Sequence, residues 1–468
     1  MSDQTILSPT HWELSSDSDA LRLHGHQLDQ LAEQFGTPLH VVNEVGLVRT
    51  AAAFQNAVRT AYDGPTRVHY PFKCNAVPGV VTILREAGLG AEVMTEFELE
   101  VALHSGFSSE EIIVNGPYKS PAFLKKCLDE RVRMIIVDSL TELELLRSLA
   151  EEQRGSMDIL LRINPRFAPS GGNWLSGVGT RNRSSFGLDL WNGETERALQ
   201  MLARQSALRF RGFHFHIGTG VRDTRDFGRA LRCLPRLKQL VESSGFAIEV
   251  LDVGGGLATP TSREFTSLEM LIYQSLSRLP AFDRDPAAVS FTHYASEVAR
   301  AVHENFPHDA LPLLLFEPGR SITSRNQLLL LKVGCTKVRS KQETWIVCDG
   351  GLSTVSMPTY YEYHEVFPCT QPHRRRDHAV TLLGPGCFAG DIIYRNKPMP
   401  DLAVGEILAI MDSGAYFTSL ESNFNIARPA IVAVSDDSVR LLRTRETFEQ
   451  MAVRDETCYA ATQHHYSI

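Results

Sequence analysis

The amino-acid sequence predicts an α/β protein with two parts, a TIM-like (β/α)8 barrel and a smaller antiparallel β domain after it. Between residues 67 and 319, short β-branched runs alternate with longer amphipathic segments, eight such runs occur, and the rhythm changes after Arg320. Strands that alternate with helices indicate a parallel sheet, and eight units over about 250 residues match a closed barrel. A doubly wound open sheet is the alternative, but it usually has fewer strands.

The eight predicted strands of the first part end in polar or glycine-rich segments. They are RVHYPFK (67–73), AEVMT (91–95), EIIVN (111–115), RMIIVDS (133–139), DILLRIN (158–164), RGFHFHIG (211–218), IEVLDVGGG (248–256) and LPLLLFEPG (311–319). Helix-like segments such as PGVVTILREAG (78–88) and SLTELELLRSLAEEQ (139–153) separate them. SFTHYASEVARAVHENF (290–306) is predicted to be a helix that follows a long insertion between the last two strands. Apolar positions three and four residues apart are typical of helices that cover a sheet.

Beyond Arg320 the strands are separated by Gly, Pro and Asp instead of helices, which is typical of an antiparallel sandwich or barrel. The predicted strands of this part lie at 326–338, 343–351, 378–386, 405–414, 429–435 and 438–445. We expect an N-terminal segment at 1–44, the barrel at 45–320 and the β domain at 321–468. Within the first segment, TPLHVVNE (37–44) is expected to add an edge strand to the β domain.

Composition excludes several classes of function. The chain has 468 residues, a net charge of -8 and interleaved acidic and basic residues, so it shows no basic stripe for nucleic acid and no polybasic membrane patch. Its apolar runs are too short to cross a bilayer, and the polar N-terminus lacks the pattern of an export signal. The eight cysteines form no CxxC pair. We expect free thiols and a cytoplasmic protein.

Functional residues of a (β/α)8 barrel gather at the carboxyl ends of its strands. Strand one ends in Lys73, strand seven in Gly254–Gly256, and strand eight in Glu317 and Arg320. Loops after strands seven and eight commonly build a phosphate site, where successive glycines let backbone N–H groups converge on an anion. Arg320 is expected to add a bidentate clamp. Taken alone, the glycine run also fits an ordinary tight turn.

Lys73, a phosphate site and an inward carboxylate together fit pyridoxal 5′-phosphate. This cofactor needs a Schiff-base lysine, a phosphate cradle and a partner for its pyridine nitrogen, which Glu317 would supply. His216 is expected to lie against the ring face. The alternatives are a satisfied core histidine, or a metal pair with His214, because residues i and i+2 of a strand share a face. The metal reading leaves Lys73 and the glycines without a role.

The combination of motifs resembles the fold-type III pyridoxal-phosphate decarboxylases, the diaminopimelate and ornithine decarboxylase group. The resemblance runs from FGTPLHVVNE (35–44) to RPAIVAV (428–434). It rests on YPFKCN, GAEVMTEFELEVAL, VDSLTELELL, HFHIGTG, LDVGGGL, FEPGR, GPGCFAGD and SGAYFTSLESNFNIARP.

The resemblance implies a role for each matching position. Lys73 would be the Schiff-base lysine, His216 the stacking histidine and Glu317 the partner of the pyridine nitrogen. Cys387 would be supplied by the neighbouring subunit to protonate the carbanion, so a homodimer with shared sites is implied. The expected cofactor contacts are Lys73, His216, Thr219, Gly254, Gly255, Gly256, Glu317, Gly319, Arg320 and Tyr416.

Departures from the family pattern bear on the substrate. Phe388 stands where the family carries an acid that grips a distal amine, Met357 where diaminopimelate enzymes usually place an arginine, and Ser185 where a lysine is frequent. HIGTG replaces the usual HIGSQ. The loop 165–185 carries several arginines that we expect to meet an anionic group on a larger substrate, with an ordinary solvated basic loop as the alternative. The expected substrate contacts are Arg162, Arg181, Arg183, Met357, Phe388 and Asp391.

These residues predict decarboxylation of an amino acid or amino-acid conjugate at Cα. We expect a substrate other than diaminopimelate or ornithine, of the kind found in siderophore or antibiotic assembly, with diaminopimelate decarboxylase of lysine biosynthesis as the alternative. A racemase would use the same lysine but needs a second base, and an arginine near the pyridine nitrogen would have favoured it. A non-catalytic homologue would not need to retain Lys73, Glu317 and Cys387.

Overall fold

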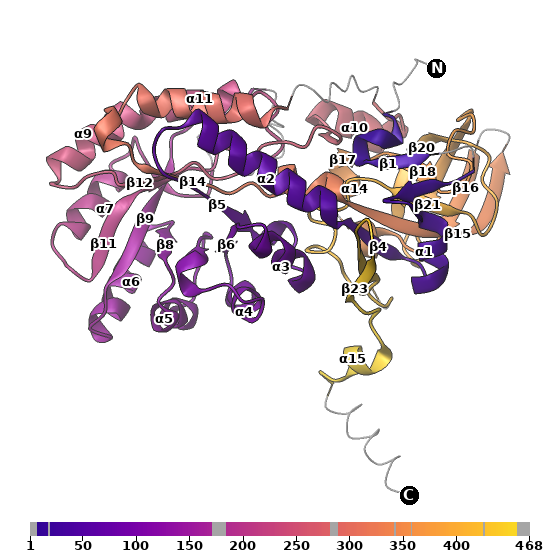
Figure 1. Cartoon of the computed structure of the whole chain (residues 1–468), viewed down its shortest axis with the longest axis horizontal. Coiled ribbons are helices and arrows are strands. Elements are labelled where there is room, and N and C mark those ends of the chain that lie inside the picture. The colour runs from indigo at the N-terminus through magenta and orange to yellow at the C-terminus, as the bar shows by residue number, and fades with distance from the viewer. Residues whose placement is uncertain are drawn as a thin grey trace, which may run out of the picture.

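A computed structural model gives the fold of the chain and describes residues 7–16, 19–170, 184–280, 289–340, 343–356, 358–424 and 426–455. The molecule has two parts, a barrel ringed by helices and a β domain beside it (Figure 1). The long helix α2 (Glu44–Ala61) runs from the β domain to the barrel and links the two (Figure 1).

Eight parallel strands close the barrel. They are β5 (Thr66–Pro71), β6 (Gly90–Val93), β7 (Ile112–Val114), β8 (Met134–Val137), β9 (Met157–Asn164), β11 (Leu208–His214), β12 (Val250–Asp252) and β14 (Leu313–Phe316). Each pairs with the next, and β14 returns to pair with β5. Each lies within or close to the run that the sequence predicts, so the barrel is confirmed. A short strand, β10 (Leu188–Asp189), pairs in parallel with the last two residues of β9.

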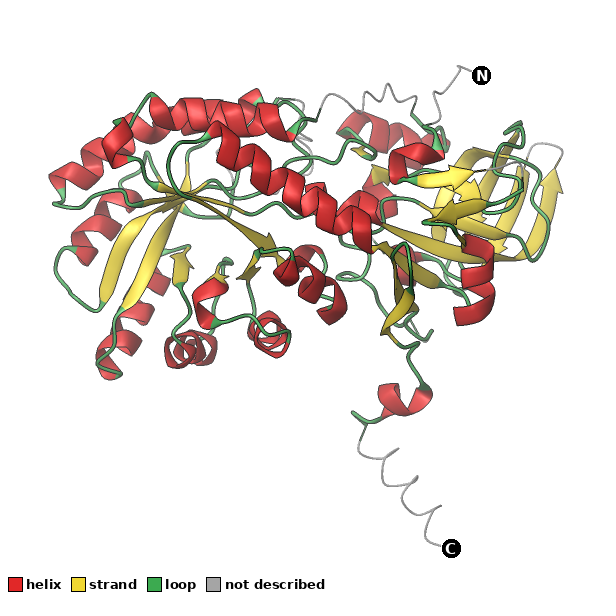
Figure 2. Ribbon diagram, in the orientation of Figure 1, coloured by secondary structure: helices red, strands yellow, loops and turns green. Residues whose placement is uncertain are grey.

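Helices cover the outside of the barrel (Figure 2). They are α3 (Pro78–Glu86), α4 (Glu96–His104), α5 (Pro121–Glu130), α6 (Leu140–Glu152), α7 (Glu194–Leu202), α8 (Arg225–Ala230), α9 (Leu234–Ser243) and α11 (Phe291–His303). Local chemistry fixes their starts: the side chains of Thr95, Ser120, Ser139 and Ser290 each accept a backbone N–H in the first turn of the helix that follows. Among the described residues, no helix is both long enough and apolar enough to span a membrane.

The β domain is built on a nine-stranded sheet. Its strands are β4 (Leu39–Asn43), β15 (Gln327–Ser340), β16 (Glu343–Cys348), β18 (Val366–Pro368), β19 (His378–Leu383), β20 (Ile392–Met399), β21 (Ile407–Ile410), β22 (Ala430–Val434) and β23 (Val439–Arg443). The sheet is mixed rather than antiparallel, since β22 pairs with β4, and β16 with β19, in the parallel sense. The predicted edge strand, β4, lies inside the sheet between β15 and β22, where all five of its residues are buried.

Smaller elements complete this part of the chain. The N-terminal strands β1 (Leu14–Ser16), β2 (Leu21–Leu23) and β3 (His26–Gln27) form a small sheet, and β13 (Arg263–Glu264) pairs with β17 (Glu362–Tyr363). The remaining helices are α1 (Leu28–Phe35), α10 (Ser267–Leu276), α12 (Arg320–Thr323), α13 (Leu352–Val355), α14 (Pro358–Tyr361) and α15 (Phe448–Ala452).

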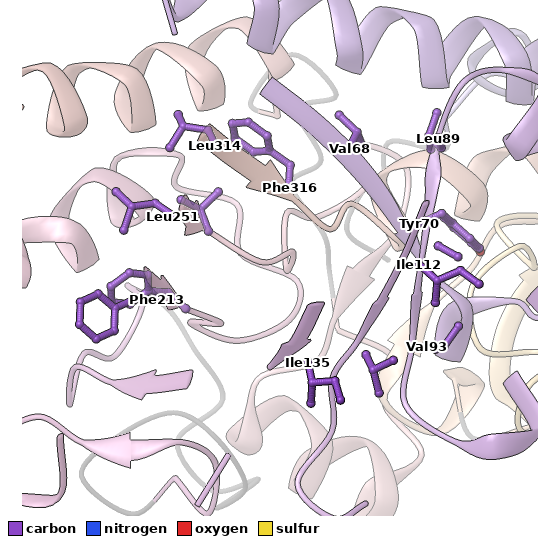
Figure 3. Packing of buried hydrophobic residues seen from close by; sticks show 14 of the residues in the cluster. Val68, Tyr70, Leu89, Val93, Ile112, Ile135, Phe213, Leu251, Leu314 and Phe316 are labelled. Carbon is purple, nitrogen blue, oxygen red and sulfur yellow. The ribbon is translucent and has the colours of Figure 1, made fainter. Parts of the chain in front are cut away.

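Strand periodicity divides the core into layers. Leu314 and Phe316 of β14 face the helices in the large cluster of Figure 3, whereas Leu315 faces the barrel interior with Met134 and Leu160. Successive side chains of a strand point to opposite faces, so one apolar run supplies both layers.

Backbone contacts join the β domain to the barrel beside the first strand end. The N–H of Tyr416 donates to the carbonyl of Cys74 at 2.8 Å, and the Asn75 amide donates to the Gln327 side chain at 3.0 Å. The buried carboxylate of Asp412 accepts from Trp12 and from Thr261. The loop that carries Tyr416 is thereby fixed against the mouth of the barrel.

Leu314 provides a test of the packed barrel wall. Replacing this fully buried residue with alanine is expected to lower the free energy of unfolding by about 2–5 kcal/mol, because the helices cannot collapse into the cavity. Urea unfolding followed by circular dichroism measures the change. Leu441→Ala, at a position 49% exposed, is the control and should shift the free energy by no more than about 0.5 kcal/mol. Equal effects of the two substitutions would contradict this packing.

Candidate active site

Lys73 lies in the turn Phe72–Cys74 that follows β5, and its ammonium contacts Glu92 on β6. The Nζ–Oε2 distance is 2.7 Å, and the glutamate side chain is 1% exposed whereas that of the lysine is 30% exposed. Burial lowers the pKa of Lys73, but the attraction of Glu92 and then Glu317 outweighs it and raises the pKa overall. The lysine is therefore held charged at the barrel mouth, next to open space.

The triple-glycine turn after β12 packs directly on neighbouring backbone. A Cβ on Gly254, Gly255 or Gly256 would lie 2.2, 2.1 or 2.0 Å from the carbonyl oxygens of Phe215, Glu317 and Gly218. Gly254 and Gly256 also have positive φ, at 65° and 100°. Only glycine fits these positions. Within the described part of the chain, the N–H groups of Gly255 and Gly256 have no acceptor, so both remain available for an anion.

Arg320 lies at the next strand end, immediately after Gly319. Its guanidinium is 5.1 Å from the ring centroid of Tyr416, and Nη1 is 2.5 Å from the carboxylate of Glu362. A Cβ on Gly319 would lie only 2.9 Å from the Pro71 side chain. The backbone at Gly319 therefore packs closely against the end of β5. Thr219 is exposed on the loop after β11. Arg320 and Tyr416 thus lie together at one strand end, and Thr219 follows Gly218, whose carbonyl packs on Gly256.

Glu317 is 2% exposed and belongs to a group of buried polar side chains at the barrel centre. The Asn115 amide donates to it at 3.4 Å, His214 Nε2 lies 3.5 Å away, and a carboxylate oxygen of Asp252 lies within 4.8 Å. Burial, and then repulsion by Glu317, raises the pKa of Asp252 well above its usual range. Burial also raises the pKa of Glu317, which Lys73 and Arg162 act to lower, so Asp252 is the carboxyl of the pair that favours the proton.

His216 lies just beyond β11, beside the glycine turn. A Cβ on Gly254 would be 3.3 Å from its Nδ1, and the ring makes no hydrogen bond to any residue that the structure describes. Burial lowers the pKa of His216 well below its usual range, so the ring is neutral. A neutral ring without polar partners suits a stacking role better than ion pairing.

Arg162 is buried at the end of β9 and is held on two sides. Its Nη1 lies 3.3 Å from Asp138, and its guanidinium lies over the Phe186 ring at 4.5 Å. It also adds positive charge near Glu317 and His216. Its role as a substrate contact stays a prediction.

The loop between β19 and β20 carries Cys387 and Phe388, both exposed. Phe388 is 52% exposed and lies 6.2 Å from the ring of Phe424. Asp391 points inward and accepts the N–H groups of Leu352 at 2.6 Å and Gly386 at 2.7 Å. Asp391 is thus engaged in shaping this loop, and in the single chain the loop presents its cysteine and phenylalanine outward.

Three of the predicted substrate residues, Arg181, Arg183 and Met357, lie outside the described residues. Conversely, the sequence prediction did not assign Glu92, Asp252 or Glu362 to the site. The signal for Glu92 was an acid within an otherwise apolar strand, and for Asp252 an acid two residues before the glycines. The sequence around Glu362 carries no comparable signal, because only the tertiary structure brings this residue to Arg320.

The residues present fit pyridoxal 5′-phosphate. Free backbone N–H groups and Arg320 suit its phosphate, the buried carboxylate of Glu317 suits a protonated pyridine nitrogen, and Lys73 suits its aldehyde. His214 offers the alternative of a metal ligand, since it lies within 4.8 Å of Asp252 and Glu317, but this grouping does not include Lys73.

Comparisons with known proteins agree with this chemistry. Residues 47–324 match the family model described as "Pyridoxal-dependent decarboxylase, pyridoxal binding domain". Diaminopimelate decarboxylase of Bacillus subtilis is 30% identical over 93% of this chain and 95% of its own, and that of Actinosynnema pretiosum is 31% identical over 97% of each. The crystal structure of diaminopimelate decarboxylase from M. jannaschii in complex with L-lysine has a TM-score of 0.83, at 26% identity over 94% of this chain and 97% of its own.

Gly256→Ala tests the phosphate cradle. The new methyl group would meet the Gly218 carbonyl at a strained φ, so the Kd for pyridoxal 5′-phosphate is expected to rise about 10- to 100-fold. Equilibrium dialysis measures it. Gly155→Ala, where no atom lies within 4 Å, is the control and should leave the Kd unchanged. Normal cofactor affinity in Gly256→Ala would show that the phosphate does not bind at this turn.

Glu92→Gln tests the charge state of Lys73. Without the carboxylate, burial lowers the pKa of Lys73, so a larger fraction is the neutral amine at pH 8. Covalent attachment of the cofactor is then expected to accelerate, by about tenfold for each unit that the pKa falls while the ammonium still predominates. Stopped-flow absorbance gives the rate, with Glu100→Gln on α4 as control. Slower attachment at every pH would show that Glu92 does not hold the proton on Lys73.

Proposed function

Because this chain belongs to the fold-type III pyridoxal-phosphate-dependent decarboxylases, we propose that it removes the α-carboxylate of a diamino acid, with diaminopimelate as the leading candidate. Pyridoxal-phosphate-dependent decarboxylation of an amino acid follows from the family itself. The observation that supports diaminopimelate is the match of nearly the whole chain to diaminopimelate decarboxylases at about 30% identity. The comparisons therefore favour the alternative substrate over the unusual conjugate that we expected first.

When bound, pyridoxal 5′-phosphate supplies an aldehyde that condenses with amines and a ring that withdraws electrons from the carbon losing CO2. The protein supplies the surroundings. Glu317, beside an Asp252 that favours the proton and near the cations Lys73 and Arg162, would stabilise positive charge at the pyridine nitrogen. Lys73 would hold the cofactor through its aldehyde, and as a free amine it would hold a proton at Nζ beside Glu92. His216 packs without polar partners, so it excludes water from one ring face.

A second subunit completes the proposed site. Cys387 is exposed on an ordered loop of the β domain, held by Asp391, and is free to reach a neighbouring chain. A thiol delivered there would return a proton to the carbon after CO2 leaves. We propose a homodimer with shared sites for this reason.

Phe388 favours a second candidate substrate. An exposed phenylalanine beside the cysteine cannot form a charge pair with a distal ammonium, and Phe424 extends the same apolar surface. A substrate whose far end is uncharged or conjugated, as in secondary metabolism, fits this surface better. The two candidates differ in what residue 388 should contact.

A CO2-release assay separates them. Wild-type protein is expected to decarboxylate meso-diaminopimelate, and Lys73→Ala to lose at least about 10³-fold in kcat/KM on every substrate. If diaminopimelate is the substrate, Phe388→Glu should lower its KM up to about fivefold, the worth of an exposed ion pair. Lysine, ornithine and amino-acid conjugates complete the panel. Release of CO2 only from a conjugate would exclude diaminopimelate and support the second candidate.

A further inference from the structure

Two glutamates flank the arginine of the phosphate site. Glu264 of β13 and Glu362 of β17 are directly opposite each other in an antiparallel pair. Glu362 lies 2.5 Å from Arg320 Nη1, and Glu264 lies 3.8 Å from Nη2. Like charges directly opposite in a ladder repel each other, and a single guanidinium offsets only one of them. The cluster therefore carries one carboxylate more than its cation neutralises.

Arg320 and Glu362 are buried, Glu264 is 25% exposed, and the cluster is incompletely hydrogen-bonded. Glu362 is 1% exposed; its Oε2 is held by the ion pairs with Arg320 and His364, and its Oε1 makes no hydrogen bond within the described part of the chain. The same holds for Glu264 Oε1 and for Arg320 Nε. Buried polar atoms of native proteins are nearly always paired, so these point to a missing partner. Arg320 keeps Nε free for that partner because Glu362 already holds Nη1.

The Glu264 carboxylate lies beside the loop after β11, and this loop packs on the triple-glycine turn. A Cβ on Gly220 would lie 2.8 Å from Glu264 Oε1, while Gly256 packs against the carbonyl of Gly218 two residues earlier. Because Gly220 has no side chain, there is room for the Glu264 carboxylate beside the triple-glycine turn. An anion on Gly255, Gly256 and Arg320 would therefore face this acid.

The groups around Glu264 leave it poised to bind a proton. Burial raises its pKa to about 7, where Arg320 acts to lower it and Glu362 to raise it further. Burial also acts to raise the pKa of Glu362, but the adjoining Arg320 lowers it overall, so Glu362 stays ionised. Among the described residues, the other ionisable neighbours include Tyr361 and Tyr416, which burial keeps neutral by raising the pKa of each, and His364, which lies 3.4 Å from Glu362. Glu264 is thus the acid of the pair that titrates near neutral pH.

We propose that Glu264 and Glu362 are positioning residues that make phosphate binding at this site proton-linked. Glu362 holds Arg320 by Nη1 so that the rest of the guanidinium faces the anion. Glu264 takes up a proton from solvent when the dianionic phosphate arrives, which removes the surplus negative charge. The inference rests on the cofactor shared by the family and not on the proposed substrate.

The sign of the effect follows from linkage. Below pH 7 Glu264 is already protonated, so binding needs no proton. Above pH 7 it is ionised, and binding the anion requires proton uptake, so affinity falls by up to about tenfold for each pH unit. The cofactor phosphate has a second pKa near 6 and is already a dianion above pH 7.5, so its own ionisation does not produce this slope.

Calorimetry with pyridoxamine 5′-phosphate tests the proposal, because this probe carries the phosphate but no aldehyde for Lys73. The cofactor-stripped full chain is titrated at pH 6 and pH 8 in buffers of different ionisation enthalpy, which gives Kd and protons bound. Wild-type protein is expected to take up close to one proton at pH 8, and Glu264→Gln close to none. The variant should bind the probe up to about tenfold more tightly than wild type at pH 8 and equally at pH 6.

Two controls separate this role from a structural one. Glu249→Gln changes an acid paired with Arg211 at the other end of the barrel and should match wild type at both pH values. Glu264→Ala should lose proton uptake as Glu264→Gln does, and thermal unfolding verifies that both fold. Equal proton uptake in wild type and Glu264→Gln, or weaker binding of that variant at both pH values, would overturn the proposal while leaving decarboxylation intact. Failure of wild type to bind the probe would overturn the cofactor site as well.

Discussion

Close backbone packing at the triple-glycine turn is the constraint on which the site depends. Gly254, Gly255 and Gly256 touch the carbonyls of Phe215, Glu317 and Gly218, so three adjacent strand ends meet with no side chain between them. Beside that contact, the N–H groups of Gly255 and Gly256 have no acceptor among the described residues, and the turn packs on the backbone of Glu317. The contacts proposed for the phosphate and for the ring nitrogen therefore belong to one packed unit, which Asp252 reinforces by accepting the N–H of Gly254 at 2.8 Å.

Buried charge is distributed around this unit in two groups. Near β5 and β6, Lys73 and Glu92 form an ion pair, and burial raises the pKa of Asp252 beside Glu317. Near β14, Arg320 faces two carboxylates. In each group the acids outnumber the cations, and buried charges without compensation are costly. A cationic ring nitrogen on the cofactor would compensate the acids near Lys73. Proton uptake on phosphate binding would compensate the acids near Arg320.

The β domain contributes Tyr416, Cys387 and Phe388 to the proposed site. Tyr416 is fixed against the barrel by its N–H on Cys74, whereas Cys387 and Phe388 extend outward on a loop shaped by Asp391. Lys73, the glycine turn and Arg320 thus lie on the barrel, whereas Cys387 and Phe388 lie on a loop of the β domain.

The sequence alone determined the eight barrel strands, Lys73 and the glycine turn, because strand periodicity and the glycine run are local signals. It did not place β4 inside a mixed sheet, since pairing partners hundreds of residues apart leave no local trace. It also gave no sign of the cluster at Arg320, which exists only because the two-residue strands β13 and β17 pair across about a hundred residues. Local periodicity thus specifies the elements and the residues at their ends, whereas long-range pairing decides which buried charges face one another.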